Sequence, residues 1–323
     1  MKTLIAAAVT AAALATTALS GTAEAATSKR VVFESQGQRL VGDLYLPDGY
    51  KPGDRLPAVI VTGAWMTVKE QMPARYAAEL ADRGFAALAF DFRGWGQSEG
   101  AVRNLESPVE KTRDIVAAAA YLATRPEIDA TRIGGLGICA SAGYMADAVA
   151  GSPNLRSLAL VAPWLHDRAL VDQVYGGREG VAKLVAVGRD AAERQARTGQ
   201  AVTLPAASKT DRSAVMFDVP YYTERDRGLI PEWDNRFNLA SWEGWLGYDA
   251  IAIAPKLGTK PAAIVHSEAA AIPDGAKRFH AALTGPKTQL WLKDVGQLDF
   301  YDRDQLVRQA ADFVADHFRT TLR

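Results

Sequence analysis

The segment Arg132–Gly143, with the sequence RIGGLGICASAG, decides the fold of this 323-residue chain. Its first half has the composition of a buried β-strand, and a helix is predicted to begin near Ala140. Between the two, Cys139 occupies a tight turn with small residues on both sides. A strained strand-to-helix turn of this kind exposes its central side chain above the sheet. It also aims the helix N-terminus at Cys139, which favours a thiolate.

Cys139 has one rival and one non-catalytic interpretation. Ser141 is the rival nucleophile, but it comes two residues later and falls inside the predicted helix. A small cysteine that only packs in the core is the other interpretation. Cys139 is the single cysteine of the chain, so a disulfide within the chain is excluded. On this turn we predict that Cys139 is the reactive group.

Strands and helices alternate on both sides of this turn. Short apolar runs predict strands at residues 39–46, 58–62, 85–90, 132–137, 158–161, 262–266 and 289–292. Helical patterns with caps or breakers cover residues 73–83, 107–125, 140–150, 274–283 and 304–318. This rhythm is typical of a mostly parallel central sheet with helices on both faces. The sequence therefore predicts an α/β fold.

Residues 164–255 interrupt the alternation. Their first part is charged and helical over Arg178–Arg197, and their second part is rich in aromatic residues and loops. An insertion of this size between two strands predicts a cap over the strand ends. Its aromatic side chains either line an apolar pocket or attach the cap to the sheet, and the sequence leaves both possibilities open.

The N-terminus and the composition limit where the protein works and what it binds. Lys2, an uncharged run and Ala23-Glu24-Ala25 predict a signal peptide over residues 1–25, cleaved after Ala25, and a periplasmic or secreted protein. Residues 26–323 then form a single domain. Lys plus Arg and Asp plus Glu both number 37, so no basic excess suggests nucleic acid. We expect a small-molecule substrate, no metal, no cofactor and no stable membrane insertion; the oligomeric state stays open.

Several segments together resemble the α/β-hydrolase superfamily, in its dienelactone-hydrolase-like and YcjY-like branch with the related polyketide transferases. The resemblance covers Phe33 to Phe318. Its specific marks are Gly63–Trp65 with Val68–Gln71, Phe90–Gly100, Gly137–Ser141 and Asp299–Asp302. The resemblance implies an α/β-hydrolase fold with the predicted insertion as its cap. It also implies an oxyanion hole formed by the backbone N–H of Ala140 and that of Ala64 or Trp65.

The same resemblance exposes two departures from the superfamily pattern. Gln297 stands where the catalytic histidine usually follows the eighth strand, and Ala270 stands where the acid usually follows the seventh. A glutamine amide cannot shuttle protons near neutral pH. Glu268 is the nearest candidate acid. His166, and less so His266, are candidate bases; the alternatives are that His166 docks the cap and that His266 packs beneath a loop.

Three functions therefore remain open. The first is a hydrolase that cleaves an ester, lactone or thioester through an acyl-enzyme on Cys139. The second is an acyl transferase of the same chemistry. The third is a degenerate member of the fold that only binds a ligand.

Overall fold

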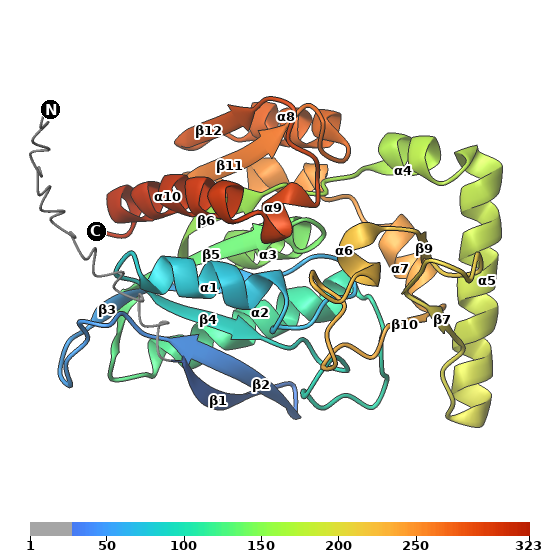
Figure 1. The fold of residues 1–323 in the computed structure, drawn as a ribbon, viewed down its shortest axis with the longest axis horizontal. Coiled ribbons are helices and arrows are strands. Elements are labelled where there is room, and N and C mark those ends of the chain that lie inside the picture. Colours follow the sequence, from blue (N-terminus) through green and yellow to red (C-terminus); the bar gives the residue numbers. More distant parts are fainter. Residues whose placement is uncertain (1–27) are drawn as a thin grey trace, which may run out of the picture.

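The computed structural model describes residues 28–323, so the predicted signal peptide and its cleavage after Ala25 lie outside the described residues. An eight-stranded sheet forms the centre, in the order β1-β2-β4-β3-β5-β6-β11-β12 (Figure 1). Its strands are β1 Ser28–Ser35, β2 Gln38–Tyr45, β3 Leu56–Thr62, β4 Ala86–Phe90, β5 Ile128–Ile138, β6 Leu155–Val161, β11 Ala262–Ser267 and β12 Lys287–Leu292. The β1–β2 and β2–β4 pairs are antiparallel, and all other neighbours are parallel.

Helices cover both faces of this sheet. Helices α1 (Met72–Ala81) and α10 (Asp304–Thr321) pack together on one face. Helices α2 (Pro108–Ala123), α3 (Ser141–Gly151) and α8 (Pro273–Ala282), with the 3-10 helix η1 (Ile251–Leu257), form the layer on the other. Strands β3, β4 and β6 and the second half of β5, residues 133–138, are almost fully buried, as expected for parallel strands covered twice. The predicted mostly parallel α/β architecture is confirmed.

The seven predicted strands and five predicted helices of the sheet and its two layers are all present, with ends shifted by a few residues. Strand β1 was missed. It is an edge strand whose outward face is exposed, and its only buried apolar side chains are Val31 and Phe33. So few buried positions give a weak periodic signal.

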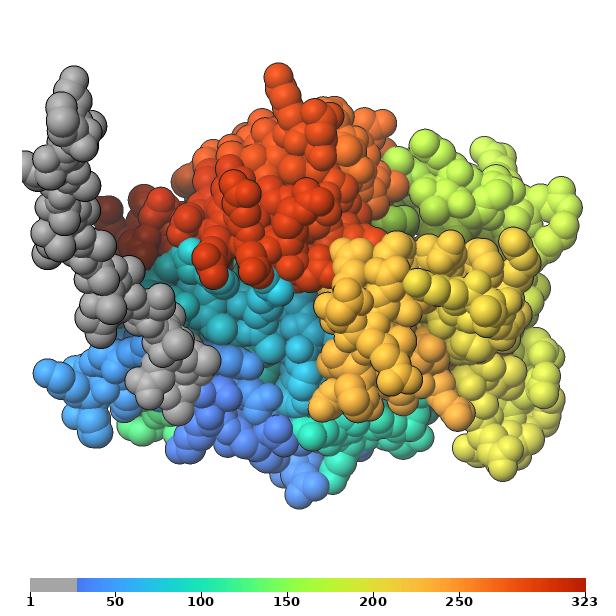
Figure 2. Space-filling model, viewed as in Figure 1, coloured from blue at the N-terminus to red at the C-terminus, as the bar shows by residue number. Residues whose placement is uncertain are grey.

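The cap segment, residues 164–255, lies at one end of the molecule, at the right of Figure 1. It contains α4 (Arg168–Val174), α5 (Gly177–Thr198), α6 (Pro220–Thr223), α7 (Ser241–Leu246) and the short strands β7 (Thr203–Pro205), β8 (Ala207–Ser208), β9 (Met216–Phe217) and β10 (Arg236–Asn238). In the space-filling view it forms a lobe beside the sheet (Figure 2). Its last residues enter η1, which packs on α3 and α8, so the chain rejoins the helical layer before Pro255.

Between residues 28 and 323, no helix has both the length and the apolar character that crossing a bilayer requires.

Candidate active site

Cys139 sits in the turn between β5 and α3 with a backbone φ of +56°. A side chain with a Cβ rarely adopts this left-handed conformation, so the turn is strained. Hydrogen bonds to the end of β6 hold it: the Cys139 N–H donates to Val161 O at 3.1 Å, and the Trp164 N–H donates to Cys139 O at 2.9 Å. A Cβ at Gly137 would approach Ser141 O to 2.8 Å. The small residues are therefore required where strand and helix meet.

Ser141 is part of the framework of this turn. It is almost fully buried, and its Oγ accepts hydrogen bonds from Thr62 Oγ1 at 2.9 Å and from the Ile138 N–H at 3.2 Å. These contacts connect the base of the turn to β3. Ser141 does not line the cavity that Cys139 faces. The structure therefore leaves Cys139 as the candidate nucleophile of the turn.

Cys139 lies on the wall of a cavity of about 690 Å³. The cavity lining is mostly apolar and contains no Asp, Glu, Lys, Arg or His among the described residues. From the segments at the carboxyl ends of the strands come Trp65, Cys139, Ala140, Gln297, Leu298 and Tyr301; from the cap segment come Trp164, Val174, Tyr175, Leu184, Val215, Met216, Val219, Tyr222, Trp242 and Trp245. Apolar clefts of this size with a few polar groups are typical of sites for small molecules.

The aromatic residues of the cap segment divide between the two possibilities that the sequence left open. Tyr222, Trp242 and Trp245 line the cavity. Trp233 instead attaches the cap segment to the sheet, because its Nε1–H donates to Met66 O at 2.7 Å. Phe237 is fully buried and packs against Trp65 with a ring-centroid distance of 5.1 Å.

Trp65 and Ala140 line the cavity beside Cys139, and their backbone N–H groups lower the pKa of its thiol. Of the two residues considered after β3, Ala64 has its N–H directed elsewhere, toward the Met72 Sδ at 3.5 Å. Trp65 is therefore the candidate donor from the loop after β3. A pair of N–H groups around a nucleophile is the arrangement that binds a developing oxyanion.

Burial raises the pKa of the Cys139 thiol above its usual value, because a charged sulfur loses its hydration. The Tyr301 hydroxyl and the N–H groups of Trp65 and Ala140 oppose this by hydrogen bonding to the sulfur. Burial prevails, so the resting group at neutral pH is the thiol.

Gln297 occupies the place beside Cys139 with a fixed orientation. Its Nε2 donates to Ala162 O at 2.8 Å and to the Tyr301 hydroxyl at 2.9 Å. Its Oε1 accepts from the Ala271 N–H at 3.1 Å. Both Nε2 hydrogens are therefore used, and Tyr301 receives one of them, which leaves the Tyr301 O–H free to donate to the Cys139 sulfur. The Tyr301 hydroxyl also lowers the pKa of the Cys139 thiol.

Tyr301 is the site residue that sequence reasoning overlooked. It was part of the motif Asp299–Asp302, which was read only as a mark of resemblance. Helix α9 (Asp299–Asp302) buries it, and burial raises its pKa well above the usual value, so it remains a neutral phenol. The spacing of four residues between Gln297 and Tyr301, one helical turn, was the available signal.

Neither position considered for the acid provides a carboxylate at the thiol: residue 270 is an alanine, and Glu268 is engaged at the surface. Ala270 is buried in the loop after β11 and offers only a methyl group. The side chain of Glu268 is 58% exposed and forms an ion pair with Lys277 at 2.6 Å. Its carboxylate also accepts from Trp291 Nε1 at 3.0 Å. Glu268 is therefore engaged at the surface, and in place of a carboxylate the Ala271 N–H contacts Gln297.

His166 lies near the start of the cap segment, and both of its ring nitrogens are engaged. Its Nδ1 accepts from Trp164 Nε1 at 2.9 Å, and its Nε2 lies 3.1 Å from Trp245 O. Burial lowers its pKa to about 4, so the ring is neutral. Since both ring nitrogens are already engaged, neither is available to the Cys139 proton in this structure. This arrangement favours the alternative in which His166 docks the cap.

His266 is fully buried at the end of β11 and packs edge-on against Trp291. Burial lowers its pKa to about 4. By distance and angle, neither ring nitrogen makes a hydrogen bond within the part of the chain that the structure describes. It does not line the Cys139 cavity. The structure thus brings neither candidate histidine to the thiol.

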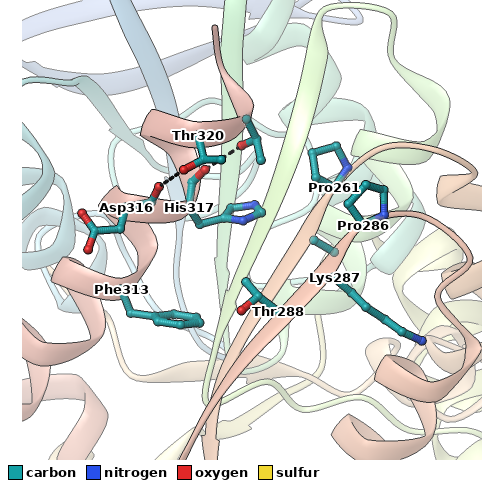
Figure 3. A pocket seen from close by; sticks show the side chains of 10 residues that line it. Pro261, Pro286, Lys287, Thr288, Phe313, Asp316, His317 and Thr320 are labelled. Atoms are coloured by element: carbon teal, nitrogen blue, oxygen red, sulfur yellow. Dashed lines mark hydrogen bonds between the residues drawn. The ribbon is translucent and has the colours of Figure 1, made fainter.

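A second cavity, of about 350 Å³, lies at the amino ends of the strands, between α10 and the starts of β11 and β12 (Figure 3). Its one imidazole, His317, is engaged at 2.8 Å with Ser157 Oγ. Ligand sites in open α/β sheets lie at the carboxyl ends of strands. The Cys139 cavity, which meets that condition, is the candidate site. No group of three metal-ligating side chains occurs anywhere in residues 28–323.

Comparison with protein families agrees with this geometry. Residues 36–212 match the family model described as X-Pro dipeptidyl-peptidase (S15 family). The chain is an α/β-hydrolase of the S15 family. The matched residues of this S15 member include the loop after β3 and the strand-to-helix turn at Cys139. The predicted superfamily is confirmed.

Two relatives of this S15 chain are bacterial proteins of uncharacterized function. PA2218 of Pseudomonas aeruginosa is 30% identical over 304 residues, 90% of this chain and 80% of the relative. The crystal structure of PA2218 superimposes with a TM-score of 0.80 over 92% of this chain and 94% of the other. YcjY of Escherichia coli is 27% identical and covers 86% of this chain and 93% of YcjY.

A third relative has a named activity. A thiohydrolase of Eupenicillium brefeldianum is 25% identical over 254 residues, 76% of this chain and 80% of the relative. This S15 member is therefore an α/β-hydrolase with thiohydrolase-like relatives.

Proposed function

We propose that this protein cleaves an apolar acyl thioester or activated ester, including lactones, through an acyl-enzyme on Cys139. One observation supports this most strongly: Cys139 stands on a strained turn at an apolar cavity, with the backbone N–H groups of Trp65 and Ala140 beside its thiol. In the first step the sulfur attacks the acyl carbon, and these N–H groups bind the carbonyl oxygen as it gains charge.

Which leaving groups can depart depends on whether the site offers a proton donor. When a thioester is attacked, the thiol proton of Cys139 passes to the departing thiolate, so a thiol is exchanged for a thiol without net proton uptake. An amine leaving group would need to be protonated before the C–N bond breaks. No imidazole or carboxylate lines the cavity among the described residues. We therefore expect thioesters and activated esters to react and peptides to be poor substrates, despite the peptidase name of the family.

The relative from Eupenicillium brefeldianum supports this choice, since it is a thiohydrolase. We further propose that the mature chain begins after Ala25 and works in the periplasm or outside the cell. There the burial of Cys139, whose residue is 7% exposed, shields the lone thiol from oxidants.

An acyl transferase is the second candidate, supported by the orientation of Gln297. Its two Nε2 hydrogens point at Ala162 O and Tyr301, and its Oε1 faces the Ala271 N–H, so this side chain is not arranged to activate water. The acyl group on Cys139 would then wait for a better nucleophile than water. If added thiols or amines increase the turnover rate and are recovered as acyl products, the protein is a transferase. Equal turnover with and without them would indicate hydrolysis.

Intact-mass measurement tests the shared first step. The mature protein is mixed with a p-nitrophenyl ester and with a simple alkyl thioester, and its mass is followed with time. We expect one acyl group per chain, located on Cys139 by peptide mapping. Turnover without any acyl mass, or an acyl group on another residue, would contradict the proposal. Binding of the acyl compound with no adduct and no turnover would instead favour a degenerate, ligand-binding member of the fold.

The pH dependence of acylation should follow the thiol rather than a histidine. Because burial raises the pKa of Cys139, the thiolate fraction is small at pH 7 and increases about tenfold per pH unit below that pKa. The acylation rate should therefore rise steadily from pH 6 to pH 9 in stopped-flow or mass experiments. Circular dichroism over the same range controls for unfolding. A plateau reached between pH 6 and 7, as an imidazole would produce, would contradict this expectation.

A further inference from the structure

A buried ion pair, Glu106 with Lys111, contacts the loop after β3 that contains Trp65 and Met66. The side chain of Glu106 is completely buried, and its Oε2 accepts from Lys111 Nζ at 2.8 Å. The ammonium group of Lys111 is itself buried over the rings of Phe92 and Trp95, at 4.7 and 4.8 Å from their centroids. A charge pair enclosed in this way gains little over an apolar pair of the same size. Its position therefore calls for an explanation beyond stability.

The carboxylate of Glu106 contacts the two elements that form the oxyanion hole. Its Oε2 accepts from the Met66 N–H at 3.1 Å, one residue after Trp65. Its Oε1 accepts from the Tyr144 hydroxyl at 2.9 Å, on helix α3, which begins two residues after Cys139. A single side chain thus connects the loop after β3 with the helix after the strand-to-helix turn.

Met66 needs such an anchor because its backbone is strained. Its φ is +63°, in the left-handed region that a residue with a Cβ rarely adopts. The peptide groups before and after its Cα are both held: Glu106 receives the Met66 N–H, and the Nε1–H of Trp233 in the cap segment donates to the Met66 C=O at 2.7 Å. The preceding N–H, that of Trp65, is the candidate oxyanion donor beside Cys139. Because Glu106 holds the peptide group that joins Trp65 to Met66, it restrains the backbone immediately after the Trp65 N–H.

Glu106 also touches the cap segment. Its own backbone N–H donates to the Ser241 Oγ at 2.8 Å, at the start of α7, whose Trp242 and Trp245 line the cavity. Glu106 thus connects the loop after β3, helix α3 and helix α7 of the cavity wall. We propose that Glu106 is a positioning residue that holds the Trp65 N–H in the oxyanion hole. This inference rests on the proposed acyl-enzyme at Cys139.

Two double variants separate positioning from folding. Glu106→Leu with Lys111→Met removes the acceptor for Met66 and replaces the ion pair by apolar side chains of similar size. Glu106→Gln with Lys111→Met keeps an acceptor, because the amide oxygen can receive the Met66 N–H while the amide nitrogen donates to Tyr144. Glu127→Gln is the matched control. Glu127 is a buried carboxylate paired with Arg125 at 2.8 Å before β5, at the far end of the strand from Cys139.

Acylation kinetics and amide hydrogen exchange are then measured on the four proteins. In the leucine variant we expect the acylation rate constant to fall about 30-fold or more, with KM changed less than about threefold, since loss of one oxyanion donor lowers kcat by about 10²–10³-fold. Exchange in a peptide covering residues 63–71 should be at least about tenfold faster. The glutamine variant and Glu127→Gln should stay within about threefold of wild type in both measurements.

The two readouts keep failures distinguishable. Unchanged exchange over residues 63–71 in the leucine variant would overturn the anchoring role of Glu106. Faster exchange with an unchanged acylation rate would overturn its part in catalysis. A glutamine variant as slow as the leucine variant would also overturn it. If the wild type forms no acyl-enzyme, the proposed function fails, while the exchange measurement still decides whether Glu106 holds the loop.

Discussion

Replacing Cys139 by alanine is expected to lower kcat/KM for an activated ester or thioester by at least about 10³-fold. Alanine is the matched change because it keeps the Cβ that the strained turn already accommodates at a φ of +56°, and removes only the sulfur. Binding of a non-hydrolysable apolar acyl analogue should stay within about threefold, since most of the cavity lining is unchanged. Steady-state kinetics and isothermal titration check the two parts.

Serine at the same position provides the informative comparison. A serine hydroxyl needs an adjacent base, whereas a thiol has some thiolate near neutral pH. Because neither His166 nor His266 reaches Cys139, Cys139→Ser should be nearly as inactive as Cys139→Ala. Alanine activity above about a tenth of wild type would contradict the role of the sulfur. A serine variant with substantial activity would show that a base operates in the site.

Restoring a histidine and its acid together should raise ester hydrolysis by about 10²-fold, the lower end of what general base catalysis contributes. The variant is Gln297→His with Ala270→Asp. A carboxylate at residue 270 would accept the Nδ1–H of the new imidazole and leave Nε2 free to take the thiol proton of Cys139. The acylation rate should then become independent of pH above about pH 7, and the acyl-enzyme should hydrolyse faster.

Each single change should fail, for a reason visible in the structure. The Ala271 N–H points at the position of Gln297 Oε1 at 3.1 Å. A ring nitrogen placed there would accept that hydrogen, so the proton of a neutral imidazole would sit on the other nitrogen, which would donate rather than accept. Gln297→His alone and Ala270→Asp alone should both stay within about threefold of wild type. Full activation by Gln297→His alone would show that the Ala271 amide does not set the tautomer.

Most of the central sheet could be predicted from the sequence because parallel strands covered on both faces are continuous apolar runs. The turn at Cys139 was equally visible, because Gly137 and Ser141 are small residues two positions before and after it at a strand-to-helix junction. The short elements of the cap segment, such as α6 and α7, escaped prediction. They are held by contacts between aromatic side chains distant in sequence, and have no periodicity of their own.

The candidate site was predictable only where it is local in sequence. Cys139, Ala140 and the segment containing Trp65 follow directly from motifs. Tyr301 and Glu106 did not stand out because their roles depend on burial and on partners far along the chain: Tyr144 is 38 positions from Glu106. His166 was weighed on its neighbour Asp167. The structure shows that its ring nitrogens contact Trp164 and Trp245, the second of which no local pattern could supply.

The division of the cavity between two sources has a consequence for how this protein can diverge. The groups that would do the chemistry come from loops after β3, β5 and β12, whereas ten of the wall residues come from the cap segment, one uninterrupted stretch of chain. Mutations in that stretch can therefore change which acyl groups fit while the reacting atoms keep their places. Exchanging that stretch between homologues would be a way to engineer selectivity, provided that the contact between Trp233 and Met66 is kept.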